Sequence, residues 1–297
     1  MNPGKRLKDL ITRPEVLVMP GAHDALSARQ IQLHGFEAAF GGGSAATTGL
    51  LAESEVGQLS MRDYADHYAR LVQSVDIPIL LDADTGFGGV HNVRLMMRAF
   101  ERSGAGGLFI EDQVFPKRCG YFAGKAVVPI EDMLAKLKAA LDARQNPDFV
   151  ICARTDVLGL EGEDAAIERA QIFLEAGVDM TFVQGADTMT TLTRICREVP
   201  CPQLANVSQA SSAAPLTVAQ IQQTGAAAVI FPVATLRAAA RAAGNVLAAL
   251  RRDGTFAAVE DLLMPTEEFS ALCGREAQQA REDDYIRAAK ALVARHT

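Results

Sequence analysis

Eight short apolar runs, separated by stretches with helical spacing, constrain the fold of this chain more than any other feature. Each run is continuously apolar rather than alternating, which is typical of parallel strands buried on both faces. The runs are Val16–Met19, Ala38–Phe40, Ile77–Leu81, Gly107–Ile110, Phe149–Ala153, Met180–Val183, Gln203–Ala205 and Ala227–Phe231. Strands that alternate with helices form parallel βα units. Eight such units predict an α/β fold with a single closed (β/α)8 TIM-type barrel.

The domain organisation follows from where the eighth run ends. Charged sequence with helical spacing continues beyond the eighth βα unit. We therefore expect a barrel domain of residues 1–259 and a C-terminal helical extension of residues 260–297. The chain has 297 residues, of which 49% are hydrophobic, and barrels of about this length are routinely single domains.

Composition and charge narrow the classes of function. The formal net charge of −7 argues against a nucleic-acid or anionic-membrane partner. No apolar stretch approaches the roughly 20 residues that span a bilayer, and five irregularly spaced cysteines do not form a disulfide framework. We expect a cytoplasmic enzyme. The lone histidines His34, His67 and His296 are expected to face solvent.

Acidic residues follow two neighbouring strands at the point where each strand ends. Asp82 and Asp84 come after the third run, and Glu111 comes after the fourth. Residues i and i+2 of a strand point to the same face, and all strand ends of a barrel meet at one rim. Crowded carboxylates need a cation, and oxygen ligands suit Mg²⁺ or Mn²⁺. The sequence predicts a metal site formed by Asp82, Asp84 and Glu111.

A possible reactive thiol follows the second acidic cluster, in the segment Lys117-Arg118-Cys119-Gly120-Tyr121. Nearby cations favour the thiolate form of a cysteine. Taken singly, a polar residue after a strand is often only a turn or a helix cap, and Thr155, Asp156 and Ser208 are open to that interpretation. Caps do not require two acidic clusters on neighbouring strands, so the whole set indicates a metal-dependent enzyme that acts on a small carboxylic acid.

Several motifs in this order and spacing resemble the isocitrate lyase and phosphoenolpyruvate mutase superfamily, and most of all its methylisocitrate lyase and dimethylmalate lyase branch. The motifs are Asp82-Ala83-Asp84-Thr85-Gly86-Phe87-Gly88, Glu111-Asp112-Gln113, Lys117-Arg118-Cys119-Gly120, Arg154-Thr155-Asp156, Leu204-Ala205-Asn206 and Phe231-Pro232. The resemblance implies a homotetramer whose subunits exchange their C-terminal helices. It also implies Mg²⁺ near the three carboxylates, partly through water, and a mobile gate at residues 117–121.

The activity that the resemblance implies is retro-aldol cleavage of a 2-hydroxy acid, a substituted malate or a methylisocitrate-like acid. The products are a 2-oxo acid, such as pyruvate, and a carboxylic acid. Cys119 would protonate the enolate carbon, and Arg154 would bind a carboxylate. The implied catalytic residues are Cys119, Lys117, Arg154 and Glu55. The implied substrate-binding residues are Gly42, Gly43, Ser44, Asp82, Gly120, Tyr121, Arg154, Gln184, Asn206, Ser208 and Pro232.

Three positions depart from the pattern of these lyases. Tyr121 stands where they usually carry His, Gln184 where they often carry Glu, and Glu55 lies in a Ser-Glu-Val-Gly loop that usually ends in Pro-Asp. The loss of charge at Tyr121 and Gln184 predicts a preference for alkyl-substituted malates over tricarboxylates.

Two other interpretations stay open. One is a phosphonomutase or an oxaloacetate decarboxylase or hydrolase of the same superfamily. Simple members of those groups usually lack the Lys-Arg-Cys-Gly segment, but the carboxyphosphonoenolpyruvate mutases keep it. The other is a barrel that binds a metabolite without catalysis.

Overall fold

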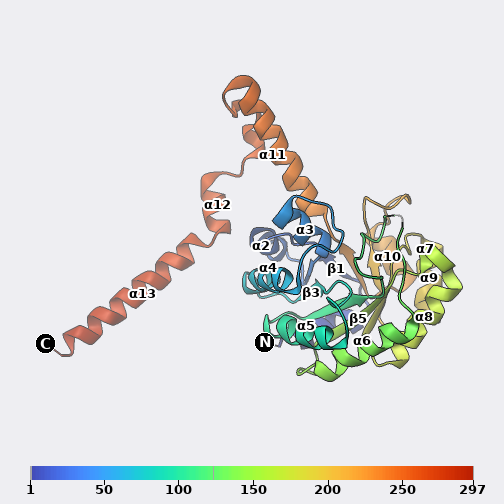
Figure 1. Cartoon of the computed structure of the whole chain (residues 1–297). Coiled ribbons are helices and arrows are strands. Elements are labelled where there is room, and N and C mark those ends of the chain that lie inside the picture. Colours follow the sequence, from blue (N-terminus) through green and yellow to red (C-terminus); the bar gives the residue numbers. More distant parts are fainter. Residues whose placement is uncertain (1, 123, 297) are drawn as a thin grey trace. The chain divides into compact units, whose positions relative to one another are not determined.

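A ring of parallel strands surrounded by helices dominates the computed structural model, which describes residues 2–122 and 124–296 (Figure 1). The strands in this part of the chain are β1 (Leu17–Pro20), β2 (Ala39–Gly41), β3 (Ile79–Asp82), β4 (Gly107–Glu111), β5 (Val150–Thr155), β6 (Met180–Val183), β7 (Leu204–Asn206) and β8 (Ala228–Phe231). Every predicted apolar run contains one of these strands or overlaps it, with ends that differ by at most two residues.

The strand pairing closes the ring. Strands β2 to β6 form a five-stranded parallel sheet, and β1, β8 and β7 form a three-stranded parallel sheet. A parallel bridge between Gly21 and Phe40 joins β1 to β2, and another between Thr181 and Gln203 joins β6 to β7. The predicted (β/α)8 barrel is therefore confirmed.

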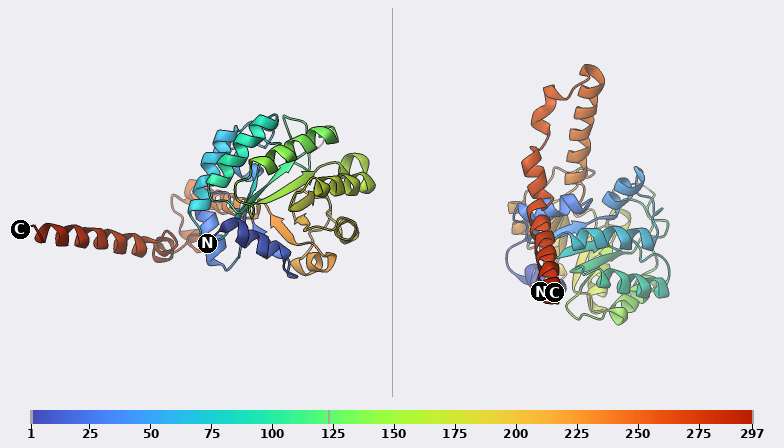
Figure 2. Two further views of the ribbon diagram at one scale, coloured as in Figure 1. Left: turned by 90° about the horizontal axis from the view of Figure 1, so that it is seen from below. Right: turned by 90° about the vertical axis from the view of Figure 1, so that its left-hand side faces the viewer.

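Helices cover the outside of the barrel (Figure 2). In the first 230 or so residues they are α1 (Pro3–Thr12), α2 (Ala25–Leu33), α3 (Gly43–Leu51), α4 (Met61–Gln73), α5 (Val90–Arg102), α6 (Ile130–Ala143), α7 (Leu158–Glu161), α8 (Glu163–Glu175), α9 (Met189–Glu198) and α10 (Val218–Thr224). Helix α1 precedes the first strand, and its buried residues Leu7, Leu10 and Ile11 pack into the same cluster as the barrel interior.

The barrel interior positions the site through the two-residue period of the strands. Alternate strand residues fill the interior core, among them Phe40, Leu80, Phe109, Cys152, Phe182 and Ile230. The next inward position along each strand lies two residues further on. Those positions are occupied by Gly42, Asp82, Glu111, Arg154, Gln184 and Pro232. The same inward-facing side of the strands therefore supplies both the apolar core and, two residues further on, the polar layer at the carboxyl ends.

The C-terminal part of the chain forms a second compact unit. The first unit ends at Arg237, inside α11 (Ala234–Asp253), and the second begins at Ala238. It continues with the 3₁₀ helix η1 (Ala257–Leu262), α12 (Thr266–Leu272) and α13 (Arg275–Ala294). The compact units thus divide earlier than residue 259, and the predicted domain boundary and helix exchange stay predictions.

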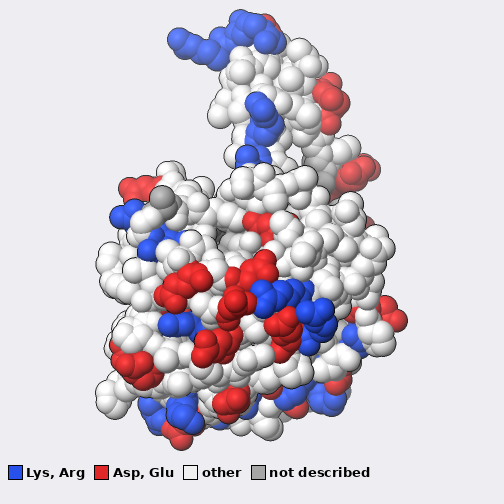
Figure 3. All heavy atoms as spheres, turned by 90° about the vertical axis from the view of Figure 1, so that its right-hand side faces the viewer, with Lys and Arg blue, Asp and Glu red and all other residues white. Residues whose placement is uncertain are grey.

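The described helices include none that combines the length and the apolar character needed to cross a membrane. On the face shown in Figure 3, basic and acidic side chains lie interspersed. The predicted absence of nucleic-acid and membrane partners stays a prediction.

Candidate active site

A cavity of about 220 Å³ opens at the carboxyl ends of the strands. Its lining includes the eleven residues predicted to bind substrate, together with Glu55 and Cys119. The predicted residues are Gly42, Gly43, Ser44, Asp82, Gly120, Tyr121, Arg154, Gln184, Asn206, Ser208 and Pro232. The remaining predicted residues, Lys117, Asp84 and Glu111, are buried beside it and contact lining residues. The fold therefore brings the whole predicted set to one place.

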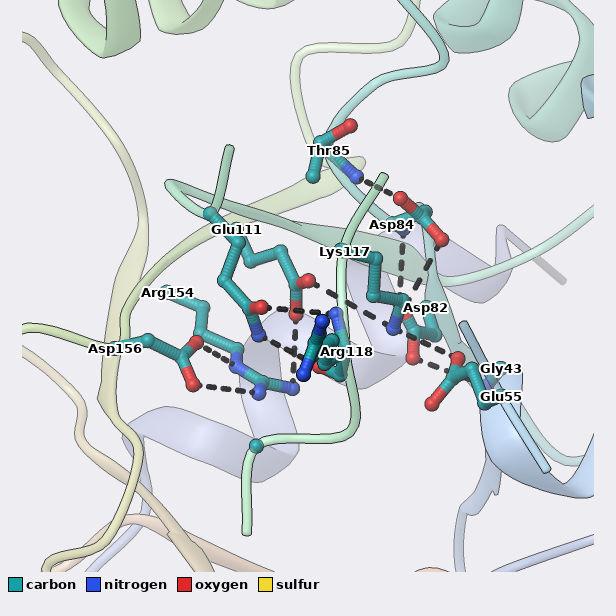
Figure 4. A network of polar contacts seen from close by, with 12 residues as sticks. Gly43, Glu55, Asp82, Asp84, Thr85, Glu111, Lys117, Arg118, Arg154 and Asp156 are labelled. Atoms are coloured by element: carbon teal, nitrogen blue, oxygen red, sulfur yellow. Dashed lines mark hydrogen bonds and ion pairs between the residues drawn. The ribbon is translucent and has the colours of Figure 1, made fainter. Parts of the chain in front are cut away.

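The acidic loop after β3 is held by its own backbone. Asp82 accepts hydrogen bonds from the amide of Asp84 at 2.8 Å and from the amide of Gly43 at 3.0 Å. Asp84 adopts a left-handed backbone with φ of 52° and accepts from the amide of Thr85 at 2.6 Å. These contacts turn Asp84 back towards the buried ammonium of Lys117, as Figure 4 shows.

Lys117 lies among three carboxylates. Its Nζ is 2.7 Å from Glu55 Oε1, 3.7 Å from Glu111 Oε1 and 3.8 Å from Asp84 Oδ2 (Figure 4). Burial alone would lower the pKa of Lys117, but Glu111, Glu55 and the aspartates hold it well above its usual 10.5. The gate residue Lys117 is thus a fixed positive charge inside the acidic cluster.

Glu111 is fully buried, and neither of its carboxylate oxygens accepts a hydrogen bond. A negative charge on Glu111 is therefore costly in free energy. Burial raises the pKa of Glu111 well above its usual 4.5, although Arg154 and Lys117 oppose the shift. Burial also raises the pKa of Asp84, opposed by Lys117. Two buried carboxylates with raised pKa values favour an additional cation at this place.

The donor set fits Mg²⁺ or Mn²⁺ only with help from other ligands. Among the described residues, no three His, Cys, Asp or Glu side chains are placed to hold a metal ion directly. Mg²⁺ commonly binds through one or two carboxylates and fills its remaining positions with water and substrate oxygens. The oxygen-only cluster of Asp82, Asp84 and Glu111 suits that mode.

Arg154 is held rigidly from three sides. Its Nε and Nη2 donate to the two oxygens of Asp156 at 2.8 and 3.1 Å, and its Nη1 lies 3.1 Å from Glu111 Oε2. The guanidinium carbon lies 5.6 and 5.2 Å from the ring centres of Phe109 and Phe182. Burial would lower the pKa of Arg154, but Asp156 and Glu111 keep it well above the usual value. The group is a permanent, oriented cation at the cavity wall.

The first turn of α3 approaches the acidic loop closely. A Cβ atom at Gly43 would lie 2.2 Å from Glu55 Oε1, so a larger residue there would displace the Glu55 carboxylate. The Gly43 amide donates to Asp82, and the expected role of Gly43 in substrate binding stays a prediction. Ser44 Oγ donates to Glu55 Oε2 at 2.9 Å. The other first-turn amides of α3 have no partners within the helix, which is the usual basis of anion binding at a helix N-terminus.

Two amide side chains leave polar atoms without partners at the cavity. Asn206 Nδ2 donates to Gln184 Oε1 at 3.3 Å. Gln184 Nε2 and Asn206 Oδ1 are buried and make no hydrogen bond. A buried donor and acceptor of this kind are costly unless a ligand satisfies them.

The predicted gate, residues 117–121, is held at several points. Gln113 holds Arg118 with two hydrogen bonds, from Nε2 to the Arg118 carbonyl at 2.9 Å and from the Arg118 amide to Oε1 at 3.0 Å. The Tyr121 hydroxyl donates to Asp187 Oδ1 at 3.1 Å. Burial and the neighbouring Asp187 raise the pKa of Tyr121 above its usual 10.0. Tyr121 is therefore a neutral hydrogen-bonded phenol at the cavity wall.

Sequence reasoning misses three residues that organise this site. Tyr64 places its hydroxyl 3.5 Å from Glu55, Asp187 fastens Tyr121, and Lys125 pairs with Asp156 at 3.1 Å. The spacing of Tyr64 within its helix predicts only that it is buried. No local signal distinguishes Asp187 or Lys125 from ordinary surface charges.

The sequence also matches a known family along most of its length. Residues 7–251 match the family described as phosphoenolpyruvate phosphomutase, so the chain belongs to that family of enzymes. The 2-methylisocitrate lyase of Aeropyrum pernix is 38% identical over 294 residues, which cover 99% of this chain and 94% of that protein. The 2,3-dimethylmalate lyase of Eubacterium barkeri is 35% identical and covers 96% of this chain and 99% of that protein.

Solved structures agree with these relatives. A 2,3-dimethylmalate lyase described as a member of the PEP mutase/isocitrate lyase superfamily has a TM-score of 0.90 at 28% identity, covering 96% of each chain. An oxaloacetate acetylhydrolase with a bound inhibitor has a TM-score of 0.89 at 28% identity, covering 95% of this chain and 97% of that one. A phosphonopyruvate hydrolase in complex with oxalate and Mg²⁺ has a TM-score of 0.86 at 29% identity, covering 96% and 100%.

These findings confirm the superfamily predicted from the motifs. The 2-methylisocitrate lyase and the 2,3-dimethylmalate lyase are carbon–carbon lyases, the enzyme class that the sequence predicts. One structural relative carries Mg²⁺ together with a small dicarboxylate.

Proposed function

We propose that this protein is a Mg²⁺-dependent carbon–carbon lyase that cleaves a 2-hydroxy acid to a 2-oxo acid and a carboxylic acid. The observation that carries the proposal is the convergence of Cys119, Arg154 and Glu55 on one cavity, directly beside the buried acidic cluster. A thiol acid, a fixed guanidinium and a carboxylate base are the three protein groups that this cleavage needs.

Asp82, Asp84 and Glu111 would hold the metal, with Mn²⁺ as a possible substitute. When bound, the metal supplies Lewis-acid stabilisation of negative charge on the substrate oxygens. The protein groups carry out the proton transfers and the positioning.

Glu55 is the group at the cavity wall that accepts the proton of the 2-hydroxyl. Lys117, Ser44 and Tyr64 hold its carboxylate in place. As the hydroxyl becomes a carbonyl, the carbon–carbon bond breaks and its electron pair moves to the other fragment as an enolate. Arg154 binds a substrate carboxylate through N–H groups of Nη1 and Nη2 that Asp156 does not occupy, on the side where Nη1 also lies 3.1 Å from Glu111 Oε2.

Cys119 donates its thiol proton to the enolate carbon and completes the second product. The gate that carries it closes over the cavity, which keeps bulk water away from the enolate. After the products leave, Glu55 releases the proton that it accepted and the Cys119 thiolate recovers one from solvent. In this scheme Cys119 is a general acid rather than a nucleophile.

The cavity wall supports a substrate with an apolar substituent. Phe40, Phe109, Phe122, Phe182 and Ile230 contribute to the lining, and burial of alkyl groups against such side chains is favourable. Tyr121 and Gln184 are both uncharged residues of the cavity wall. This favours alkyl-substituted malates over tricarboxylates as substrates.

The test is a screen of 2-hydroxy acids for release of pyruvate or glyoxylate, with and without Mg²⁺. We expect Mg²⁺-dependent release from an alkylmalate and no turnover of oxaloacetate. Oxalate release from oxaloacetate would favour the hydrolase alternative, which the similarity to oxaloacetate acetylhydrolase makes worth including. Binding without turnover of any acid would favour the metabolite-binding alternative.

We further propose a cytoplasmic homotetramer. The C-terminal unit leaves large apolar side chains exposed, for example Leu247 at 65%, Leu292 at 58% and Tyr285 at 72%, and burial in a subunit interface would remove that cost. All five cysteines are free thiols, which suits a reducing compartment. Light scattering of the full chain, and of a chain without residues 260–297, tests the assembly: we expect four subunits and fewer, respectively.

A further inference from the structure

Lys125 lies just beyond the gate, on the returning arm of the loop that carries it. An antiparallel bridge joins Gln113 to Val127, and the Val114 amide donates to the Ala126 carbonyl at 2.8 Å. The gate residues 117–121 therefore project from a paired stem, and Lys125 lies where that stem meets the gate.

The Lys125 ammonium makes two contacts, one with the gate and one with the barrel. Its Nζ donates to the Gly120 carbonyl at 2.5 Å and to Asp156 Oδ1 at 3.1 Å. Its side chain is only 11% exposed, and Asp156 is fully buried. A buried, charge-assisted pair of this kind has a defined geometry, unlike a surface ion pair.

Asp156 shares one oxygen between the gate and the active-site cation. Oδ1 accepts from both Lys125 Nζ and Arg154 Nη2. Oδ2 accepts from Arg154 Nε, and Figure 4 shows the two bonds between Asp156 and Arg154. The gate backbone also packs directly on the guanidinium, because a Cβ atom at Gly120 would lie 2.5 Å from Arg154 Nη2. Gate position and Arg154 orientation are therefore set by the same few atoms.

We propose that Lys125 is a positioning residue that couples closure of the gate to the orientation of Arg154. The inference rests on the proposed role of Arg154 in binding a carboxylate. With the gate closed, Lys125 completes the partners of Asp156 and fixes the guanidinium. With the gate lifted, Lys125 loses its contact with the Gly120 carbonyl. If closure of the gate raises the affinity of a carboxylate ligand for Arg154 by some factor, binding of that ligand raises the closed-to-open ratio of the gate by the same factor.

The first measurement follows the gate without any turnover. The rate of alkylation of Cys119 by iodoacetamide, read by peptide mass spectrometry, reports how often the gate opens. Lys125→Met should raise that rate about tenfold, the scale of one lost charge-assisted hydrogen bond. Lys125→Arg should restore most of the protection. Lys138→Met, an exposed lysine on α6, is the matched control, and the exposed Cys273 is the internal reference.

The second measurement follows the guanidinium. Oxalate in the presence of Mg²⁺ serves as the carboxylate probe, and calorimetry gives its Kd. Lys125→Met should weaken oxalate binding about tenfold although Lys125 does not line the cavity, and Lys138→Met should not. Lys125→Gln, which keeps a neutral donor, should fall between wild type and Lys125→Met in both measurements.

Each contrary result removes a defined part of the proposal. An unchanged Cys119 alkylation rate in Lys125→Met would show that Lys125 does not hold the gate. Faster alkylation with an unchanged Kd for oxalate would overturn the coupling to Arg154. Absence of oxalate binding by the unsubstituted protein would overturn the carboxylate role of Arg154 and the coupling with it. Neither readout uses lyase turnover, so a failure of the proposed reaction is distinguishable from a failure of this inference.

Discussion

The ammonium of Lys117 and the carboxylate of Glu55 form an ion pair at 2.7 Å, with side chains 1% and 4% exposed. The two residues come from separate loops, after β4 and before α4. A pair of this kind costs desolvation on both sides. Because the pair joins the loop of the gate to the loop of Glu55, it holds the gate and the proposed base in register.

Breaking this pair from either side should destabilise the protein unequally. Lys117→Met leaves Glu55, Asp84 and Glu111 without their shared cation, and we expect a loss of about 3 kcal/mol or more of unfolding free energy. Glu55→Gln leaves Lys117 with two other carboxylates, so its cost should be smaller. Urea unfolding of both variants and of the double variant measures the difference.

The exposed pair Lys5–Asp9, also at 2.7 Å, supplies the control. Lys5→Met should leave the unfolding free energy nearly unchanged, because solvent screens exposed pairs. Equal costs for Lys117→Met and Lys5→Met would contradict the view that Lys117 is held by a buried cluster.

The thiol of Cys119 should be needed for turnover but not for folding. Cys119→Ser should lower kcat by at least about a hundredfold, the scale of a lost positioned general acid, because a hydroxyl is a far weaker acid. Cys273→Ser, in the C-terminal unit, should be neutral. Near-normal turnover of Cys119→Ser on a cleavable substrate would favour a mutase or decarboxylase, whereas stereospecific deuterium incorporation into the released acid supports the lyase.

Activity should require a divalent metal and disappear in excess chelator. Glu111→Gln keeps the shape of the side chain, although it weakens the ion pairs with Arg154 and Lys117, whereas Asp82→Ala would leave two backbone amides without an acceptor. We expect Mg²⁺ to raise the Tm of the wild type and to raise that of Glu111→Gln much less. Full activity in excess chelator would contradict the metal assignment.

His67 should make stability sensitive to acid. Burial, followed by the charge of Arg70, lowers its pKa below the usual 6.5. Below pH 6.5 the unfolded chain gains a proton that folded His67 resists. The stability that neutral His67 allows is therefore present above pH 6.5 and is lost as the pH falls towards the folded-state pKa.

The corresponding measurement is urea unfolding between pH 5 and 7.5. His67→Gln should reduce the loss of stability on the acid side, and His34→Gln, at an exposed position, should not. A wild-type curve that His67→Gln leaves unchanged over this range would show that the histidine titrates alike in both states.

His67 is buried in α4, and the helical spacing of the sequence contains the signal for this burial. The expectation that it faces solvent is wrong. Tyr64, His67, Tyr68 and Leu71 follow the i, i+3, i+4, i+7 spacing of one helix face, and all four are buried in α4. The periodicity of these four positions predicts that His67 is buried, whereas its residue type taken alone predicts exposure.

Strands and site positions are predictable for a related reason. The apolar runs fix the strands, and the two-residue period then places Asp82, Arg154 and Gln184 at the rim. The partners of the gate are not predictable in this way. Lys125 meets Asp156, and Tyr121 meets Asp187, only because the barrel closes and the gate folds over it, and no local pattern encodes those distances.

The departures at Tyr121 and Gln184 lead to a prediction about specificity. Tyr121 is a neutral phenol that donates to Asp187, and the unpartnered Gln184 Nε2 and Asn206 Oδ1 offer one donor and one acceptor. Arg154 is the cation next to Tyr121 and Gln184, and it is already assigned to another substrate carboxylate. An additional carboxylate at this end of the substrate would therefore lack a cation of its own, and a buried unpaired charge is costly. An alkyl group with at most a neutral polar atom fits better.

We therefore expect a higher kcat/KM for an alkyl-substituted malate than for methylisocitrate. Tyr121→His with Gln184→Glu should shift the ratio of the two values towards the tricarboxylate, because the imidazole of the new histidine can be protonated near neutral pH. Tyr121→Phe separates the two roles of the tyrosine: it removes the hydrogen bond to Asp187 but keeps the ring, so it should loosen the gate without changing the ratio. A wild type that prefers methylisocitrate would mean that other lining residues, such as Arg154 or Ser208, set the charge preference of the cavity.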